Sequence, residues 1–351
     1  MKLEYVIVKL KELVETVPQM KVGVEYVVPR GWLVSKFTAS NCTLVSENVD
    51  EVYRPIDLTE LKRCNKNAKI LLMRTSGFGD QMWVSACARY LYDHFGKNIA
   101  TITMGCLPEY QAAIEYIPRV AYVEAPLTLE QWKTYDYHVC FAGIIDGCTV
   151  NKENVYELFL ASMGVDVAQA DMTKYGRPWL HLANSIPNPF KVPTVILQAI
   201  SAGSIRDLPI STVIALLHGL ELRGYQTVIP IDVREERSLF AVSTIKKHLP
   251  GYGTSYFFSP DITPNQDPRL ETLLPYLDHA EWIIGTDSSF CHFAEGLGIP
   301  AITVFGPFSA ESRVKHYQSV VAIDRNPSCR CARHTEGYCS KGFVPAPCLR
   351  I

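Results

Sequence analysis

The sequence predicts an α/β protein in which two doubly wound parallel sheets follow a small β-rich unit. From residue 67 onward, short apolar runs of strand length alternate with amphipathic runs of helix length, which is typical of parallel sheets with helices on both faces. The alternation pauses at 184–193, where Pro and Asn are concentrated, and then resumes. We therefore expect three parts: a β-rich appendage over 1–66, a first α/β domain over 67–188, and a second over 189–351 with a Cys-rich tail from about 325.

Composition supports a folded globular chain and excludes some partners. The 351 residues are 48% hydrophobic and 20% charged, and the formal net charge is −2. No whole-molecule field therefore attracts nucleic acid or acidic lipid. No run approaches the roughly 18 apolar residues of a membrane span, and the N-terminus lacks a signal-peptide pattern. We expect a cytoplasmic protein without a membrane span.

The appendage is expected to contain a short amphipathic helix and then antiparallel strands. Short β-type runs separated by Gly, Pro and Asn are found at 23–28, 31–37, 42–46 and 51–56.

The two α/β series are predicted from their hydrophobic periodicity. The first has strands at 69–74, 99–105, 121–125 and 135–143, with helices at 80–95 and 107–117. The second has strands at 194–200, 225–231, 281–286 and 300–306, with helices at 209–224, 235–249, 271–280 and 288–298. Ligands of such sheets lie beyond the carboxyl ends of the strands, so the strand-to-helix junctions are where function is expected.

The first junction is Arg74–Asp80. Gly77 and Gly79 remove side chains where the backbone turns or approaches a ligand, but the spacing is not G-x-G-x-x-G, so no dinucleotide fingerprint is present. Asp80 begins the next helix. It is either a carboxylate stabilised by the helix dipole or a base directed at a substrate.

Two junctions in the second domain have residues suited to phosphate. Ser204 and Arg206 precede a helix, and Arg206 either neutralises a phosphate with its fork of donors or is a solvent-exposed arginine. Asp287 and Ser288 lie between the end of a predicted strand and the start of a predicted helix, a position suited to helix capping and to anion binding. Ser289 adds a hydroxyl and His292 follows one turn later; the alternative is an ordinary cap with a packed histidine.

The tail has four cysteines within 20 residues, at Cys329, Cys331, Cys339 and Cys348. Their spacing is not a common zinc pattern, but four thiolates so close together are able to form a tetrahedral structural site. We therefore expect a structural Zn or Fe there, with His334 as a substitute ligand; disulfides are disfavoured in the cytosol.

These motifs resemble those of glycosyltransferase family 9, the ADP-heptose:lipopolysaccharide heptosyltransferases. The family's R-x-S-x-x-G-D segment matches Arg74–Asp80, and its loop with a basic residue ahead of a helix resembles 203–209. Its D-S-G-x-x-H-x-A-x-x-x-G-x-P signature, with a later F-G-P, matches Asp287–Pro307, and a Cys-rich tail ending in C-L-R is similar to 348–350. Ser289 replaces the usual Gly and Arg206 stands where Lys is common. Autotransporter heptosyltransferases, which resemble this family, have added N-terminal structure and a Cys-bound iron.

The resemblance implies a GT-B fold, in which two Rossmann-like domains face a cleft, and an inverting transfer without a catalytic metal. Asp80 becomes the expected general base. The donor is expected to be bound by residues of the second domain, with Ser204, Arg206, Ser288, Ser289 and His292 on the diphosphate. Asp287 is expected to orient this loop or to accept a hydrogen bond from a hydroxyl of the donor sugar. Ser76, Gly77 and Gly79 form the expected phosphate or acceptor loop, while Asp232 and Glu235 are assigned to the nucleoside from their position after a strand.

The sequence thus predicts a transferase that moves a heptose or other hexose-like sugar from a nucleotide-diphosphate donor. The acceptor hydroxyl is expected on a glycan, a protein or modified DNA, no cofactor is expected in catalysis, and a homo-oligomer is left open. The alternative is a non-catalytic module that binds a nucleotide sugar or nucleic acid and is organised by the Cys-rich metal site.

Overall fold

The chain forms two compact units, Met1–Cys148 with Tyr156–Asp171 and Thr149–Val155 with Met172–Ile351. Among the residues that the structure describes, no helix is long and apolar enough to cross a membrane. The computed structural model describes residues 5–38, 40–47, 49–63, 67–75, 77–142, 144, 153–182, 187–188, 190–201, 206–230, 236–248, 255–258, 276–306 and 308–325.

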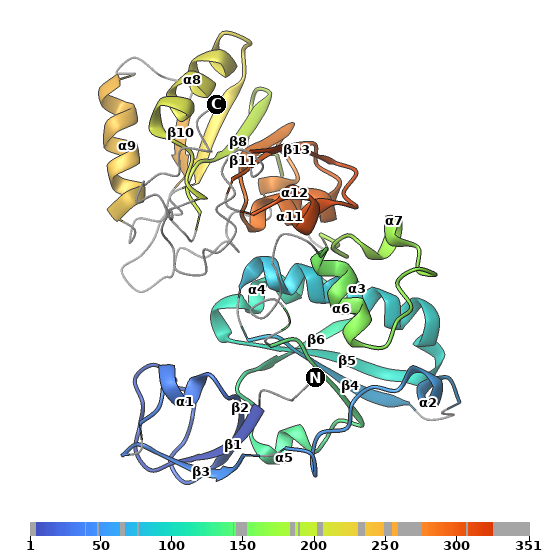
Figure 1. The fold of residues 1–351 in the computed structure, drawn as a ribbon. Helices are drawn as coiled ribbons and strands as arrows, with labels where there is room; N and C mark the ends of the chain where they lie inside the picture. The colour runs from blue at the N-terminus through green and yellow to red at the C-terminus, as the bar shows by residue number, and fades with distance from the viewer. Residues whose placement is uncertain are drawn as a thin grey trace. The chain divides into compact units, whose positions relative to one another are not determined.

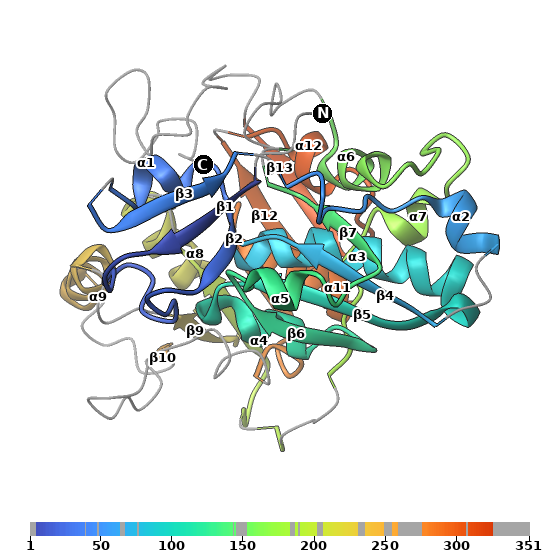
Figure 2. The same ribbon diagram turned by 90° about the horizontal axis from the view of Figure 1, so that it is seen from below.

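Unit 1 is built on a four-stranded parallel sheet with the order β6-β5-β4-β7. The two central strands, β4 and β5, are mostly apolar and mostly buried, as expected for strands covered on both faces. Figure 1 shows α3, α4 and α6 on one face, and Figure 2 shows β7, β4, β5 and β6 side by side in this order. The elements are β4 Ala68–Met73, β5 Ile99–Cys106, β6 Val120–Glu124, β7 Tyr137–Cys140, α2 Leu58–Arg63, α3 Phe78–Phe95, η1 Gly96–Asn98, η2 Pro108–Tyr110, α4 Gln111–Glu115, α5 Leu129–Trp132 and α6 Val155–Ser162.

The N-terminal β unit covers the other face of this sheet, together with α5 (Figure 1). It is a three-stranded antiparallel sheet, β2-β1-β3, and its central strand is buried on both sides. One side packs within the β unit through Val6, Val8 and Leu10. The other side, with Tyr5 and Ile7, joins Leu71 and Met73 of β4 in one apolar cluster. The bounds are β1 Tyr5–Leu10, β2 Glu25–Pro29, α1 Trp32–Ser35 and β3 Cys42–Ser46.

Three expectations for the β unit are wrong. The expected N-terminal helix is β1, because Tyr5–Leu10 needs two apolar faces and only a central strand provides them. Trp32–Ser35, expected within a strand, is one helical turn that places Trp32 in the β-unit core. The run 51–56 forms only an isolated bridge between Pro55 and His138 instead of a strand.

Unit 2 is built on a six-stranded parallel sheet with the order β10-β9-β8-β11-β12-β13. Its buried cluster joins four strands and two helices through residues such as Leu197, Ile229, Ile284, Val304, Leu217 and Ile245. The sequence predicted neither β10 nor β13, the two outer strands, and the expected helix at 271–280 lies mostly outside the described residues. The elements are α7 Met172–Tyr175, β8 Thr194–Gln198, α8 Ile210–Glu221, β9 Gln226–Pro230, α9 Glu236–His248, β10 Ser255–Phe258, β11 Trp282–Thr286, α11 Ser289–Leu297, β12 Ala301–Phe305, α12 Ala310–Val314 and β13 Val320–Asp324.

A buried carboxylate ties the segment after α7 to this sheet. Glu295 of α11, 1% exposed, lies 2.6 Å from the Arg177 guanidinium. Its other oxygen accepts hydrogen bonds from the backbone N–H groups of Gln318 and Ser319 at 3.0 and 2.7 Å. A buried carboxylate contributes to stability only when all of its partners are present, because removal of one partner leaves an uncompensated charge or polar group.

We predict that Glu295→Gln lowers the free energy of unfolding by about 3 kcal/mol, because the amide leaves the Arg177 charge without its partner. Urea denaturation followed by circular dichroism measures it. The control is Glu47→Gln, which removes the exposed Arg30–Glu47 pair and should cost no more than about 0.5 kcal/mol. Equal effects of the two substitutions would contradict the assignment.

Candidate functional site

Both parallel sheets reverse their strand order at one point, and the candidate residues follow the strands on either side of it. In unit 1 the reversal lies between β4 and β7, and in unit 2 between β8 and β11. Helices connected to the two strands diverge there, which leaves a crevice at the carboxyl ends that backbone groups and side chains are able to line. Arg74–Asp80 follows β4, Arg206 follows β8, and Asp287 follows β11.

The junction after β4 depends on Gly77. This residue has φ +73°, and a Cβ atom there would lie 2.8 Å from Cγ of Asp80 and 3.0 Å from both carboxylate oxygens. A larger residue would therefore be strained and would displace the carboxylate. Gly77 also stands directly before α3, whose first turn contains Asp80. The positive φ agrees with the predicted turn of the backbone at this glycine, and a close approach to a ligand there stays a prediction.

Arg74 holds the carboxylate of Asp80. Nε and Nη2 of Arg74 donate to Oδ2 of Asp80 at 2.8 and 2.5 Å, and Nη1 donates to the Phe141 carbonyl at 3.0 Å. The Phe141 carbonyl follows β7, so the guanidinium spans the strand reversal. Gln81 donates to the Arg74 carbonyl at 2.9 Å. The side chain of Arg74 is 8% exposed and that of Asp80 17%, so the pair is shielded but reachable.

The junction after β11 presents the N-terminus of α11. Ser288 is the N-cap, but its side chain makes no capping hydrogen bond. Its buried Oγ has no hydrogen-bond partner among the residues that the structure describes. A buried hydroxyl beside the unsatisfied N–H groups of a helix start is a ready site for an anion. Ser289 follows as the first helical residue and is partly exposed.

Arg206 joins the two junctions of unit 2. Its Nη1 donates to the Asp287 carbonyl at 2.9 Å and lies 3.7 Å from Oδ2 of Asp287. Its own carbonyl accepts a hydrogen bond from Thr286 Oγ1. Asp287 is 3% exposed, whereas the Arg206 side chain is 24% exposed. Asp287 therefore orients the arginine, and part of the guanidinium stays reachable for a ligand.

His292 is a buried, uncharged imidazole at neutral pH. It is 3% exposed, and its Nδ1 shares a hydrogen bond with the Tyr317 hydroxyl. Burial lowers the pKa of His292 to about 3; Asp287 opposes this shift, and the charges of Arg313 and Arg206 add to it. The charged groups that act on the imidazole are thus two arginines and one carboxylate, with an excess of one positive charge.

Sequence reasoning missed Arg313, Tyr317 and the role of Arg74. Arg313 is 7% exposed, and its guanidinium carbon lies 4.7 Å from the centre of the Phe308 ring. Neither Arg313 nor Tyr317 belongs to a motif, so nothing local distinguishes them. Arg74 is the first residue of the R-x-S-x-x-G-D segment, and its position six residues before Asp80 was the feature of the sequence that could have indicated the pairing.

Several predicted residues lie outside the described residues, and their roles remain predictions. Where the structure describes the chain, no group of three or more His, Cys, Asp or Glu side chains is arranged to hold a metal. The undescribed candidates are Ser76, Ser204, Asp232, Glu235, Cys329, Cys331, His334, Cys339 and Cys348.

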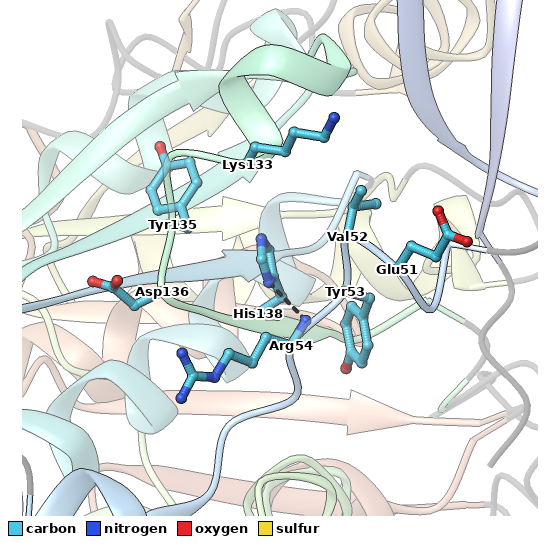
Figure 3. Close-up of a pocket in the computed structure, with 8 residues that line it drawn as sticks. All are labelled: Glu51, Val52, Tyr53, Arg54, Lys133, Tyr135, Asp136 and His138. Atoms are coloured by element: carbon cyan, nitrogen blue, oxygen red, sulfur yellow. Dashed lines mark hydrogen bonds between the residues drawn. The ribbon is translucent and has the colours of Figure 1, made fainter.

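A separate hollow of about 300 Å³ lies in unit 1 at the amino end of β7, away from the strand ends discussed above (Figure 3). Its floor includes His138, whose Nδ1 accepts from the Arg54 N–H at 3.2 Å and whose Nε2 bonds to the Trp132 carbonyl at 3.0 Å. The imidazole also stacks on the Trp132 ring at 4.7 Å. Both ring nitrogens are engaged, so His138 joins segment 51–54 to β7. The hollow is lined by Glu51, Val52, Tyr53, Arg54, Lys133, Tyr135, Asp136 and His138.

Solved structures with a similar fold include glycosyltransferases. Escherichia coli ADP-heptose lipopolysaccharide heptosyltransferase II matches with a TM-score of 0.52 and 15% identity, over 73% of this chain and 90% of that one. A family 9 glycosyltransferase from Veillonella parvula matches with a TM-score of 0.54 and 11% identity, over 82% and 94%. The iron-containing dodecameric glycosyltransferase TibC from enterotoxigenic E. coli gives a TM-score of 0.49 at 14% identity, over 92% and 78%.

No protein-family model matches the chain, and no curated protein sequence matches it. At these identities the likeness concerns the fold. The two parallel sheets agree with the predicted Rossmann-like domains. The chain has the GT-B fold of the heptosyltransferase-like glycosyltransferases.

Proposed function

We propose that the protein is an inverting, metal-independent glycosyltransferase that uses a nucleotide-diphosphate sugar. The observation that carries this proposal is that the two strand-order reversals present different chemical groups. Unit 1 presents a carboxylate held by an arginine, whereas unit 2 presents a helix N-terminus with an excess of positive charge. A base and an anion site are the two parts that sugar transfer from a diphosphate requires.

The donor diphosphate is assigned to unit 2. The N–H groups at the start of α11, the Ser288 hydroxyl and the reachable part of Arg206 are suited to phosphate oxygens. Arg313 adds a second positive charge near His292. These preorganised donors stabilise the negative charge that develops on the leaving diphosphate. That supply of positive charge is our reason for proposing transfer without a catalytic metal.

Asp80 is assigned as the general base. The acceptor hydroxyl gives its proton to the Asp80 carboxylate while its oxygen attacks C1 of the sugar. The bond between C1 and the diphosphate oxygen breaks, and the diphosphate leaves with the electron pair, which inverts the configuration at C1. Arg74 orients the carboxylate through two hydrogen bonds before the acceptor arrives.

The sugar is proposed to be a heptose or a hexose-like relative, and Asp232 and Glu235 remain proposed contacts of the nucleoside. The structural metal at the tail cysteines and a homo-oligomer also remain predictions. The alternative is a non-catalytic module organised by a metal site. No described residue supports it, because all four tail cysteines lie outside the described residues.

Arg206→Gln should weaken binding of a nucleoside diphosphate about 10- to 100-fold, because a charge-assisted contact to phosphate is lost. Isothermal titration with ADP, UDP and GDP measures it, and the parent nucleosides should bind equally to both proteins. Arg223→Gln, which removes an arginine whose guanidinium donates to the Gly219 carbonyl of the preceding helix, is the control. No binding of any of the three nucleotides by folded wild-type protein would overturn the donor assignment.

Asp80→Asn should lower turnover of a bound nucleotide sugar, measured as its slow hydrolysis, by about 100-fold or more while its affinity stays the same. The amide retains the shape of the carboxylate but is not a base. Asp93→Asn, at an exposed position of the same helix, is the matched control. If Asp80→Asn hydrolyses the donor at the wild-type rate, Asp80 is not the base.

The buried His292 should make the protein less stable in acid. Its folded pKa, about 3, lies below the unfolded value of about 6.5, so the unfolded state binds the proton and stability falls as the pH drops. His292 alone should remove about 2 kcal/mol between pH 7 and pH 5. Urea denaturation at both pH values should show this loss reduced in His292→Gln and retained in the exposed control His181→Gln. An unchanged loss in His292→Gln would refute it.

A further inference from the structure

Two aromatic side chains flank Asp80 at the carboxyl edge of the unit 1 sheet. Phe78 is the first residue of α3, and Tyr110 ends the turn that follows β5. Their rings meet edge to face, with centroids 5.3 Å apart and an interplanar angle of 89°. Both side chains are partly exposed. The pair therefore presents an apolar surface to solvent in a region that also contains the proposed base.

Tyr110 lies close to the Asp80 junction itself. The Gly77 backbone hydrogen-bonds to its phenol oxygen, and the Asp80 charge is near enough to act on it. Burial, more than the neighbouring Glu109, raises the pKa of Tyr110, while the Gly77 hydrogen bond opposes that rise. The phenol is thus neutral at physiological pH and is held next to the carboxylate.

The charges at this edge are mainly negative. In the described residues that follow the four strands (74–75, 77–80, 106–110, 124–127 and 141–142), the charged side chains are Arg74, Asp80, Glu109 and Glu124. The guanidinium of Arg74 is bonded to the Asp80 carboxylate and the Phe141 carbonyl. Proteins that bind a phosphate backbone place Lys and Arg side chains along it. This edge has the opposite character, so a nucleic acid or a sugar phosphate would be repelled.

We propose that Phe78 and Tyr110 form the acceptor-recognition surface and that the acceptor is an uncharged sugar ring. The apolar C–H face of a sugar packs against aromatic rings, while carboxylates such as Glu109 accept hydrogen bonds from its hydroxyl groups. This inference rests on the proposed function, since one sugar hydroxyl must reach Asp80. Phe78 and Tyr110 are then specificity-determining residues of the acceptor side.

The test is saturation-transfer NMR on the full chain with four kinds of probe: methyl glycosides of gluco-, manno-, galacto- and heptopyranose, glucose 6-phosphate, a ten-nucleotide oligothymidylate, and a Ser/Thr-rich peptide. At least one methyl glycoside should bind, and more tightly than its charged counterparts and the peptide. Phe78→Ala and Tyr110→Ala should each weaken it about fivefold or more. Tyr110→Phe should retain binding, since the ring remains.

The control is Phe240→Ala, which removes a 67% exposed ring of α9 and should leave glycoside binding unchanged. Tighter binding of the phosphate, the oligonucleotide or the peptide than of every glycoside would overturn the proposal, as would glycoside binding that survives both alanine variants. Titration of ADP, UDP and GDP on the same samples separates the two proposals. If a nucleotide binds and no glycoside does, the acceptor inference fails and the donor assignment stands.

Discussion

The structure depends on one constraint of parallel sheets: every strand ends at the same edge, and the chain must leave that edge in two directions where the strand order reverses. In unit 1 the reversal separates β4 from β7, and in unit 2 it separates β8 from β11. Each reversal is spanned by an arginine: Arg74 reaches the Phe141 carbonyl after β7, and Arg206, which follows β8, reaches the Asp287 carbonyl after β11. In both units, an arginine thus links the two chain segments that leave the sheet at the reversal, and its guanidinium lies among the candidate site residues.

The two arginines serve different electrostatic purposes. Both Nε and Nη2 of Arg74 are directed at Asp80, so its charge stabilises the carboxylate and little remains for a ligand. Arg206 touches Asp287 more loosely, at 3.7 Å, and a quarter of its side chain is exposed. Together with Arg313 it leaves the surroundings of His292 positive, and burial keeps the imidazole itself uncharged. The same pairing of arginine and aspartate therefore supports both proposed roles, a base in unit 1 and an anion site in unit 2.

The N-terminal β unit is a structural layer of unit 1. Tyr5 and Ile7 of β1 share an apolar cluster with Leu71 and Met73 of β4, the strand that leads directly into Arg74 and Asp80. The Gln19 side chain also donates to the Ala125 carbonyl at the end of β6. Changes in the β unit are therefore expected to act on the position of β4. This layer takes the place that a second set of helices would occupy on that face.

The sequence by itself determined the α/β class, the parallel strands and the strand-to-helix junctions. Buried parallel strands can be recognised as continuous apolar runs. Glycine, serine and aspartate at their ends can be recognised because turns and helix N-termini favour these residue types. Asp80, Arg206, Asp287, Ser288 and His292 were all found in this way. Candidate site residues could therefore be predicted from the sequence where their proposed role depends only on their position at the end of a strand or the start of a helix.

Only the tertiary structure decided the features that depend on residues far apart in the sequence. β1 was mistaken for a helix because its second apolar face is needed only when the strand is central in a sheet. Arg313 and Tyr317 approach His292 from a helix and a turn that no motif marks. The protonation state of His292 follows from its burial. Tyr110 lies near enough to Asp80 to feel its charge because β5 lies next to β4. The order of the strands results from the packing of the whole chain, so no local sequence pattern predicts it.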